Sequence, residues 1–430
     1  MMGMPIGPNF FEAQVVIPPE ARETPSESAD PAPQRIFYAV GPGDAAGYFR
    51  NRRDGVAPAF HTPIAFSLQF FKAFEKQGHR LYLLSSHARA ERVTLGPHTI
   101  ENLPRPRIYF CGGIRHHLGL LVYGLRILSR ALRFRAQVAI VDSGTTHWIV
   151  LALFALFRIP VIAVLHNALW AAGYRPTHGV RHLIHITDGW FFRRFAAASV
   201  AVSPEIRRQI LAVAGQPKGP QFVFVPLYRK DFFLRIPPPP PHSRRPFNVL
   251  YLGRVEYYKG IFDLMTMAET LDREAPGDYR WKIVGEGSDF AALEAEVLRR
   301  NLGHLVRVQH NMADEDAAVA TLGWAHVNIV PTRHEFREGL AMTAVEGVLA
   351  GRPVVLTSVV PAGEVLPGAT VEVPADDVEG LTGAIRQLAN DEELYQRLRA
   401  GTTALQPTFY DPTRGLGACL LQAMKAIGRA

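Results

Sequence analysis

The chain has 430 residues, of which 48% are hydrophobic and 20% charged, and its formal net charge is +8. This ordinary globular balance and length are enough for two domains with substantial cores. The only cysteines, Cys111 and Cys419, lie far apart in sequence, which argues for a reducing compartment and against a disulfide scaffold or a zinc site.

The N-terminal residues 1–34 are rich in Pro, Ala and Glu and lack the basic-then-apolar order of a signal peptide, so we expect a disordered tail. A strand is predicted over Arg35–Val40, followed by the loop Gly41-Pro42-Gly43-Asp44. Gly41 and Gly43 are candidates for a close approach of the backbone to a diphosphate, and Asp44 for an acceptor contact. The same tetrapeptide is also typical of a simple turn.

Alternating strands and helices follow in the first half. A helix is predicted over Ile64–Lys76, and buried-type strands at Arg80–Leu84, Ala136–Val141, Pro160–Leu165, Ser199–Val202 and Phe222–Val225. Such apolar strands separated by helices predict a parallel sheet covered on both faces. Two polar residues follow strands of this sheet. His166 is a candidate for a hydrogen bond to a donor-sugar hydroxyl, or is simply a packing histidine, and Asp142 is a candidate for an acceptor contact.

Two apolar stretches bear on membranes. The run Trp148–Phe157 has ten residues, whereas a membrane span needs about twenty, so a buried helix is expected there. In the stretch His117–Arg135, three arginines at spacings of four and three, Arg126, Arg130 and Arg133, lie beside a wide apolar face. This pattern favours either a helix on an anionic bilayer or a core-packed crossover helix with a solvated arginine face.

Five consecutive prolines, Pro237–Pro241, separate the two halves and predict a stiff interdomain linker. After it, the strand Val249–Leu252 runs into Gly253-Arg254, and Lys259-Gly260 opens a helix. Open α/β sheets bind ligands at the carboxyl ends of their strands, where a guanidinium fork and an ammonium suit phosphate oxygens. Alone, Arg254 and Lys259 are also explained as a solvated basic pair.

A pair of glutamates follows the strand predicted at Ala325–Pro331. Glu338 lies at a strand-to-helix turn, and Glu346 lies about 12 Å further along the helix. The helix N-terminus at Gly339-Leu340 offers unpaired N–H groups to a phosphate. This arrangement predicts sugar hydroxyls at Glu338, a diphosphate at Gly339-Leu340 and a ribose at Glu346. A solvated helix face is the alternative, but the small and apolar neighbours of Glu346 disfavour it.

The combination Gly-Arg-x4-Lys-Gly (253–260), Val-Gly-Glu-Gly (284–287), Glu-Gly-x6-Glu (338–346) and Gly-Arg-Pro-Val-Val (351–355) resembles the donor half of retaining family 4 glycosyltransferases of GT-B fold. The resemblance covers the C-terminal half specifically and the N-terminal half loosely. Near the N-terminus, Gly-Pro-Gly replaces the family's usual Gly-Gly. The end of the first domain has Val225-Pro226-Leu227-Tyr228-Arg229 in place of the usual Asn-Gly-type loop, so the acceptor side is less well defined.

The resemblance implies a nucleotide-diphospho-sugar donor, retention of anomeric configuration, and no metal or other cofactor. Arg254 and Lys259 match the diphosphate clamp, Glu338 the donor-sugar contact, Glu346 the ribose contact and His166 a cleft histidine. The implied fold is α/β, with two Rossmann-like doubly wound parallel-sheet domains facing across a cleft. The expected organisation is a tail (1–34), an acceptor-side domain (35–230), a linker (231–246), a nucleotide-sugar domain (247–405) and a C-terminal helix crossing back to the first domain (406–430).

Three functions stay open from the sequence. The first is a retaining glycosyltransferase acting on a lipid-linked, polysaccharide or small-molecule acceptor. The second is a sugar-nucleotide epimerase of GT-B fold, for which the spacing of Glu338 and Glu346 is not expected. The third is a non-catalytic glycosyltransferase-like partner protein. With no zinc-finger, RNA-recognition or helix-turn-helix pattern, nucleic acid is not an expected partner. We expect a cytoplasmic enzyme, with peripheral binding to an anionic inner membrane face as an open alternative.

Overall fold

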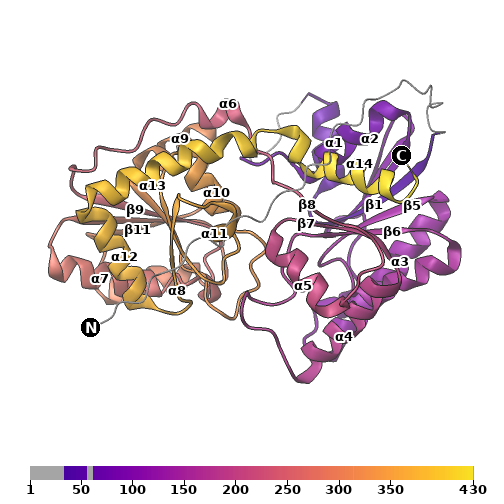
Figure 1. Cartoon of the computed structure of the whole chain (residues 1–430), viewed down its shortest axis with the longest axis horizontal. Coiled ribbons are helices and arrows are strands. Elements are labelled where there is room, and N and C mark those ends of the chain that lie inside the picture. The colour runs from indigo at the N-terminus through magenta and orange to yellow at the C-terminus, as the bar shows by residue number, and fades with distance from the viewer. Residues whose placement is uncertain (1–32, 56–61, 313, 430) are drawn as a thin grey trace, which may run out of the picture. The chain divides into compact units, whose positions relative to one another are not determined.

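The computed structural model describes residues 33–55, 62–312 and 314–429, and all that follows concerns these residues. They build two α/β halves, each around its own sheet (Figure 1). The disordered tail predicted for residues 1–34 lies almost wholly outside the described residues. Within the described part, no helix combines the length and apolar character needed to cross a bilayer.

The first sheet has eight strands in the order β3-β4-β2-β1-β5-β6-β7-β8, and every neighbouring pair except β3 with β4 is parallel. Its central strands are mostly apolar and buried because helices cover both faces. The strands are β1 (Arg35–Pro42), β2 (Arg80–Ser86), β3 (Glu91–Leu95), β4 (His98–Asn102), β5 (Val138–Asp142), β6 (Val161–Leu165), β7 (Ala196–Ala201) and β8 (Gln221–Val223).

The helices of this half are α1 (Ala45–Arg53), α2 (Phe66–Phe74), α3 (Ile114–Phe134), α4 (Gly179–Arg194) and α5 (Pro204–Ala214), with the short 3₁₀ segments η1 (Glu75–Gln77) and η2 (Arg107–Phe110) and the longer η3 (Trp148–Phe157). The short α6 (Lys230–Phe233) follows and contacts α9 (Glu315–Trp324) of the second half. The hairpin β3–β4 is absent from the sequence prediction because only Val93 of β3 is buried, so its pattern is mostly polar.

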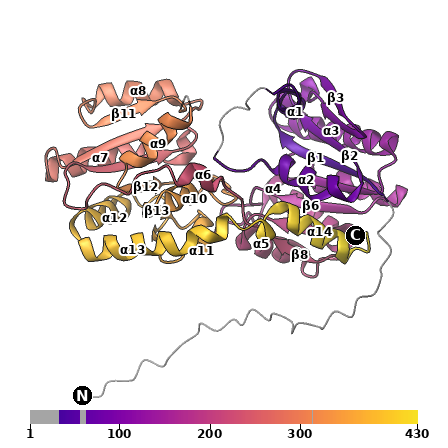
Figure 2. The same ribbon diagram turned by 90° about the horizontal axis from the view of Figure 1, so that it is seen from above.

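The second sheet is fully parallel, in the order β11-β10-β9-β12-β13-β14. Its strands are β9 (Phe247–Leu252), β10 (Tyr279–Val284), β11 (Val306–Gln309), β12 (Val327–Val330), β13 (Val354–Thr357) and β14 (Thr370–Val373). The helices are η4 (Tyr257–Lys259), α7 (Asp263–Glu274), α8 (Phe290–Arg299), α9 (Glu315–Trp324), α10 (Met342–Leu349), α11 (Ala362–Val365), α12 (Val378–Asn390) and α13 (Glu392–Leu405), of which α12 and α13 lie side by side (Figure 2).

Each sheet contains a point at which the chain order reverses, between β1 and β5 in the first and between β9 and β12 in the second. Open parallel sheets bind ligands beside such points, at the carboxyl ends of the strands. The two parallel doubly wound sheets confirm the fold class expected from the sequence.

The proline-rich segment packs against the second half. The Arg352 guanidinium, fully buried, donates hydrogen bonds to the carbonyls of Pro237 (2.9 Å), Gly323 (3.0 Å) and Ala325 (3.2 Å). Burial lowers the pKa of this arginine to about 10. The segment is therefore anchored at one end by a buried cation, which its composition does not reveal.

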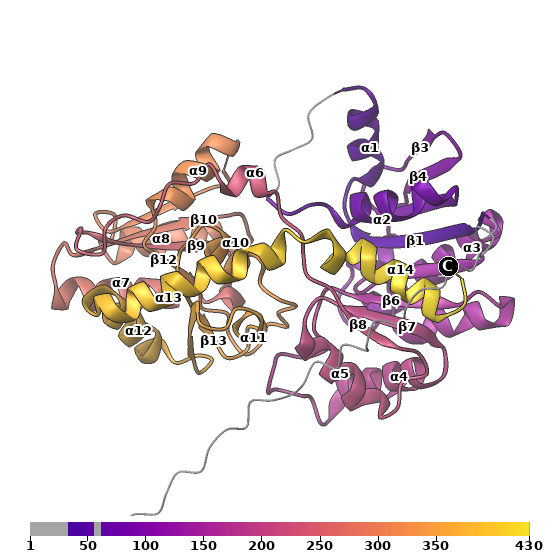
Figure 3. The ribbon, with the colours of Figure 1, turned by 45° about the horizontal axis from the view of Figure 1, so that its top comes forward.

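The chain ends on the first half. After η5 (Gln406–Phe409) and η6 (Pro412–Arg414), α14 (Leu416–Ala426) packs on α2 and β7 (Figure 3). The side chain of Gln69 in α2 accepts a hydrogen bond from the Leu416 amide at 3.0 Å. The sequence predicted a C-terminal helix over residues 406–430, but Pro412 and Gly415 confine the last α-helix to Leu416–Ala426.

Candidate active site

A cavity of about 310 Å³ lies at the carboxyl ends of strands from both sheets. The first half contributes Phe66, His166, Asn167 and Val202. The second half contributes the turn after β9, the loop after β12 and the start of α10. These residues are Tyr251, Leu252, Gly253, Arg254, Lys259, Val330, Thr332, Phe336, Glu338, Gly339, Leu340, Ala341, Met342 and Thr343.

Two cations of the cavity wall share one aromatic ring. Lys259 Nζ lies 4.0 Å and Arg254 Cζ 5.0 Å from the centroid of the Phe336 ring. The π face of a phenyl ring attracts cations, so Phe336 helps hold both charges at the cavity. The two side chains differ in exposure, which is 13% for Lys259 and 54% for Arg254. Lys259 is therefore the better fixed of the two.

The close approach of η4 to β12 requires a glycine. Gly260 has φ +73°, and a Cβ added there would lie 2.1 Å from the carbonyl oxygen of Pro331. Only glycine adopts this conformation without strain and without that clash. Gly260 thus brings Lys259 against the loop that carries Glu338.

Glu338 is the buried acid of the cavity, only 8% exposed. Its Oε2 forms a short ion pair with Lys259 Nζ and accepts a hydrogen bond from Thr332 Oγ1 at 3.3 Å. A buried carboxylate needs such partners, because burying an unpaired charge is costly. The same carboxylate raises the pKa of the Tyr251 hydroxyl, after burial as the main cause.

From the first half, His166 enters the cavity directly after β6. Its ring stacks on Phe66 with centroids 4.5 Å apart, and its Nε2 lies 3.2 Å from Oδ2 of Asp142 at the end of β5. Asp142 also accepts hydrogen bonds from the Tyr38 hydroxyl (2.8 Å) and the Gly41 amide (3.1 Å). The carboxylate is thereby fixed beside the imidazole, whose two ring nitrogens have no hydrogen-bond partner within the described residues. Burial raises the pKa of the Tyr38 hydroxyl well above its ordinary value, and the negative charge of Asp142 raises this pKa as well.

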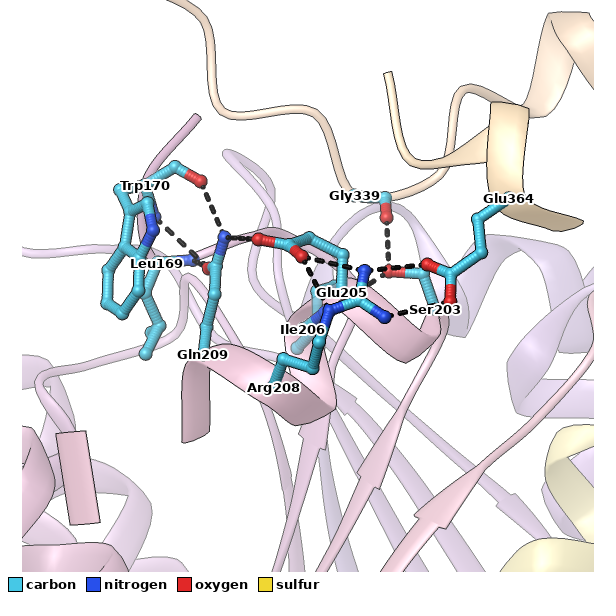
Figure 4. Close-up of polar contacts among 9 residues, drawn as sticks. All are labelled: Leu169, Trp170, Ser203, Glu205, Ile206, Arg208, Gln209, Gly339 and Glu364. Carbon is cyan, nitrogen blue, oxygen red and sulfur yellow. Dashed lines mark hydrogen bonds and ion pairs between the residues drawn. The ribbon is translucent and has the colours of Figure 1, made fainter. Parts of the chain in front are cut away.

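The loop at Gly339 touches the first half closely. A Cβ on Gly339 would lie 1.8 Å from the carbonyl oxygen of His166, so no larger residue fits. The Ser203 hydroxyl donates a hydrogen bond to the Gly339 carbonyl at 2.9 Å and also caps α5 (Figure 4). These contacts hold the candidate phosphate-binding turn against His166.

The first turns of α5 add a second polar link. The Arg208 guanidinium donates two hydrogen bonds to the Glu364 carboxylate, at 2.8 and 2.7 Å, and also pairs with Glu205 (Figure 4). Gln209 accepts from the Leu169 amide at 2.8 Å and donates to Glu205 at 2.8 Å. The bidentate pair fixes geometry, although an exposed ion pair adds little stability.

The residue before α10 has an uncommon backbone. Ala341 has φ +69°, a left-handed conformation that costs a residue with a Cβ roughly 1–2 kcal/mol. It follows Gly339 and Leu340 and precedes the first residues of α10, of which Met342 and Thr343 line the cavity. Strain of this kind gathers at binding sites because the surrounding structure enforces it.

Glu346 lies in α10 and is not among the residues lining the cavity. Its carboxylate accepts a short hydrogen bond from the hydroxyl of Thr62, in the first half. Burial raises the pKa of Glu346 to about 7, although the Thr62 hydrogen bond opposes the shift. The ribose contact stays a prediction for this residue.

The segment Gly41-Pro42-Gly43-Asp44, whose first two residues end β1, is not part of the cavity wall. The Gly43 amide donates to the Ser86 carbonyl at 3.0 Å, and Asp44 caps α1 by accepting from the Gly47 amide at 2.8 Å. Asp44 also accepts from the Asn102 side chain at 2.6 Å. Of this segment, only Gly41 is linked to the cavity, through Asp142.

One group of possible metal ligands occurs among the described residues. His334, Glu335 and Asp376 have ligand atoms within 4.8 Å of one another. The Arg333 guanidinium lies 3.7 Å from Glu335 and 3.6 Å from Asp376, so a cation already neutralises this group. Its charge disfavours a metal ion there.

The structure therefore brings together His166, Arg254, Lys259, Glu338, Gly339 and Leu340, with Asp142 behind His166. Sequence reasoning missed Phe66, Phe336, Thr332 and Ser203. Of these four, only Phe336 could have been suspected from the sequence, because it lies two residues before Glu338 in the same loop. The roles of the other three depend on contacts between distant parts of the chain.

This arrangement belongs to a known class of enzymes. Residues 66–226 match the family "Glycosyltransferase Family 4", and residues 235–404 match the family "Glycosyl transferases group 1". The two matches cover the first and second halves in turn. The chain is a glycosyltransferase and belongs to the group 1 glycosyltransferases of GT-B fold, as the sequence motifs predicted.

Individual relatives are distant. Glycogen synthase of Mycobacterium tuberculosis is 25% identical over 339 residues, which is 73% of this chain and 76% of the relative. Sucrose-phosphate synthase of Thermosynechococcus elongatus has a similar structure, with a TM-score of 0.69 at 16% identity over 91% of this chain and 98% of that one. An E. coli trehalose-6-phosphate protein bound with UDP-2-fluoro glucose gives 0.68 at 12% identity, over 91% and 99%.

Proposed function

We propose that the protein is a retaining glycosyltransferase that moves a sugar from a nucleotide-diphospho-sugar to a glycan or lipid-linked acceptor. The observation that carries the proposal is the grouping of Arg254, Lys259 and Glu338 at the Phe336 ring, beside the start of α10. Two cations and free amides at a helix N-terminus suit a diphosphate. The likeness to a protein bound with UDP-2-fluoro glucose supports a nucleotide sugar as donor.

In this proposal, Arg254 and Lys259 neutralise the diphosphate as it leaves. A loose, cation-like transition state needs electrostatic stabilisation at the leaving group more than a strong base. The two side chains supply this charge, so no metal ion is required. Lys259 exchanges its Glu338 partner for phosphate oxygens, and Glu338 then accepts a hydrogen bond from a sugar hydroxyl.

His166 and Glu346 complete the donor site as proposed. His166, stacked on Phe66 and 3.2 Å from Asp142, contacts a hydroxyl of the donor sugar from the first half. Glu346 contacts the ribose after its carboxylate turns from Thr62. The acceptor enters from the first half, which carries the stacked rings of His166 and Phe66. The expected location is the cytoplasmic side of the cell.

The test is product analysis with a panel of sugar nucleotides. Mass spectrometry should find transfer to an acceptor or slow hydrolysis, and NMR should find the anomeric configuration of the donor in the product, with activity kept in the presence of a chelator. An inverted product or chelator-sensitive activity contradicts the mechanism. An epimerised nucleotide would indicate the epimerase alternative, and no reaction with any donor the non-catalytic one.

A further inference from the structure

The outward side of α3 carries apolar residues where a water-facing helix normally carries polar ones. Ile114 is 76% exposed, Leu118 45%, Leu121 41% and Leu125 44%. Spacings of four and three place these side chains on one side of the helix, opposite the buried side around Ile127. The apolar face noted in the sequence is thus split into a buried and an exposed part.

The next elements repeat the pattern. At the end of η3, Leu156 is 75% exposed and Phe157 50%. On α4, four exposed residues occur at spacings of three, three and four: Val180, Leu183, Ile186 and Trp190, with exposed fractions of 61%, 62%, 56% and 49%. Both α3 and α4 pack against η3, so the three elements are neighbours. Thirteen of the eighteen exposed large apolar residues in the described part lie between residues 110 and 190.

The exposed charges of the same region all have one sign. From Asn102 to Pro204 the sequence has twelve arginines, no lysine and two acids, a net charge of +10 against +8 for the whole chain. Both acids, Asp142 and Asp188, are only 4% exposed, so the exposed charge of the region is entirely positive. Arg130 forms an ion pair with Glu101 at 3.2 Å, whereas Arg115, Arg126 and Arg133 are exposed.

We propose that α3, the end of η3 and α4 form a docking surface for an anionic lipid bilayer. Leucine and tryptophan side chains enter the headgroup and acyl boundary while the arginines pair with lipid phosphates. Nucleic acid offers no apolar phase for the exposed leucines. A second copy of the chain would bring two strongly positive surfaces together, and like charges disfavour that contact.

A basic hollow beside α4 fits a lipid headgroup. It has a volume of about 310 Å³ and is lined by Arg175, His182, Arg193 and Trp190, among others. Arg193 donates its Nε–H to the Ala214 carbonyl at 2.7 Å, which fixes the guanidinium at the rim. Within the described residues, the buried Nδ1 of His182 has no hydrogen-bond partner. A phosphate ester here would complete the polar side of the docking surface.

The docking surface rests on these exposed residues alone. The consequence of docking for the reaction depends on the proposed glycosyl transfer. A docked enzyme meets its acceptor at the membrane, which favours a lipid-linked acceptor. Binding to vesicles and transfer of sugar are separate measurements, so either part can fail without the other.

The experiment is co-sedimentation of the full chain with phosphatidylcholine vesicles, with and without about 30% phosphatidylglycerol. We expect binding to the anionic vesicles at low salt and release at high salt. Ile114→Glu with Leu118→Glu, and separately Val180→Glu with Leu183→Glu, should each weaken vesicle binding at least about tenfold. Leu298→Glu is the matched control, since Leu298 is 78% exposed on α8 of the other half, and it should bind as the wild type does.

Nucleotide-diphosphate affinity, measured by calorimetry, should be the same in all four proteins, which shows that the variants fold. Absence of vesicle binding by the wild type at low salt overturns the proposal, as does equal loss in the Leu298→Glu control. Light scattering that finds a dimer dissociated by the α3 and α4 variants, without vesicle binding, would instead indicate a second copy as the partner.

Discussion

The two walls of the cavity are built from different chemistry. The wall from the second half carries Arg254, Lys259 and Glu338, all following strands β9 and β12. The wall from the first half presents the His166 ring stacked on Phe66, with its carboxylate, Asp142, buried behind it. One half therefore supplies charge for a diphosphate, whereas the other supplies shape and an imidazole stacked on a phenyl ring. Variants on the two walls should therefore fail in different ways.

The largest effect is expected from Glu338→Gln. This change keeps the shape but removes the charge that we propose contacts the donor sugar, so turnover should fall about 100-fold or more. Steady-state transfer assays measure it. Glu335→Gln, an exposed residue of the same loop, should keep near wild-type turnover. Equal turnover of Glu338→Gln and wild type would show that the charge of Glu338 has no role in the transfer reaction.

A smaller loss is expected on the other wall. His166→Ala should lower the transfer rate about 10- to 100-fold, the scale of one positioned polar group, while nucleotide-diphosphate affinity stays within about twofold of wild type. His178→Ala, at an exposed position before α4, serves as control. A large drop in nucleotide-diphosphate affinity for His166→Ala would break the division of labour between the walls.

Glu346 links the halves, and its protonation should be visible in stability. Its folded pKa of about 7 lies above the ordinary value of 4.5, so the folded chain binds this proton more tightly than the unfolded chain does. The free energy of unfolding should therefore fall as the pH rises from 4.5 to about 7. Glu346→Gln should remove about 2 kcal/mol of that fall, measured by urea unfolding at about pH 5 and about pH 8.

Asp188 provides the comparison for this measurement. Burial raises its pKa to about 7, with Arg337 opposing the shift, so it contributes a second fall over a similar pH range. Asp188→Asn should remove the part of the stability loss that comes from Asp188 and leave the part that comes from Glu346. Unchanged pH dependence in Glu346→Gln would show that the Thr62 contact leaves the carboxylate ionised in the folded protein.

The smallest effect concerns the left-handed residue before α10. Ala341→Gly should raise the free energy of unfolding by about 0.5 kcal/mol, because glycine relieves the strain at φ +69° but loses more chain entropy on folding. Urea midpoints measure it. Ala344→Gly, inside the same helix, should instead lower stability by about 1 kcal/mol. A loss in both variants would mean that Ala341 is not strained.

The sequence was informative where the site follows local pattern. Arg254, Lys259 and Glu338 follow strands β9 and β12 of the second sheet, and His166 follows β6 of the first, so the apolar strands and turn residues indicated the carboxyl ends of both sheets before any contact was known. The departures arise from long-range contacts. The Gly43 amide donates to the Ser86 carbonyl and Asp44 accepts from the Asn102 side chain, both distant in sequence, and the Thr62 hydroxyl donates to Glu346 across 284 positions of the chain. Exposure on α3 was equally hidden, because an apolar face looks the same in sequence whether protein or solvent covers it.

The most direct test of the account is calorimetric titration with uridine diphosphate. Lys259→Ala should weaken binding by about 1–3 kcal/mol, the scale for losing a charged hydrogen bond, and Arg254→Ala by less, since its side chain is 54% exposed against 13% for Lys259. Lys425→Ala, an exposed lysine of α14, should bind as wild type does. Unchanged affinity in both Lys259→Ala and Arg254→Ala, with the wild type binding, would contradict the diphosphate clamp.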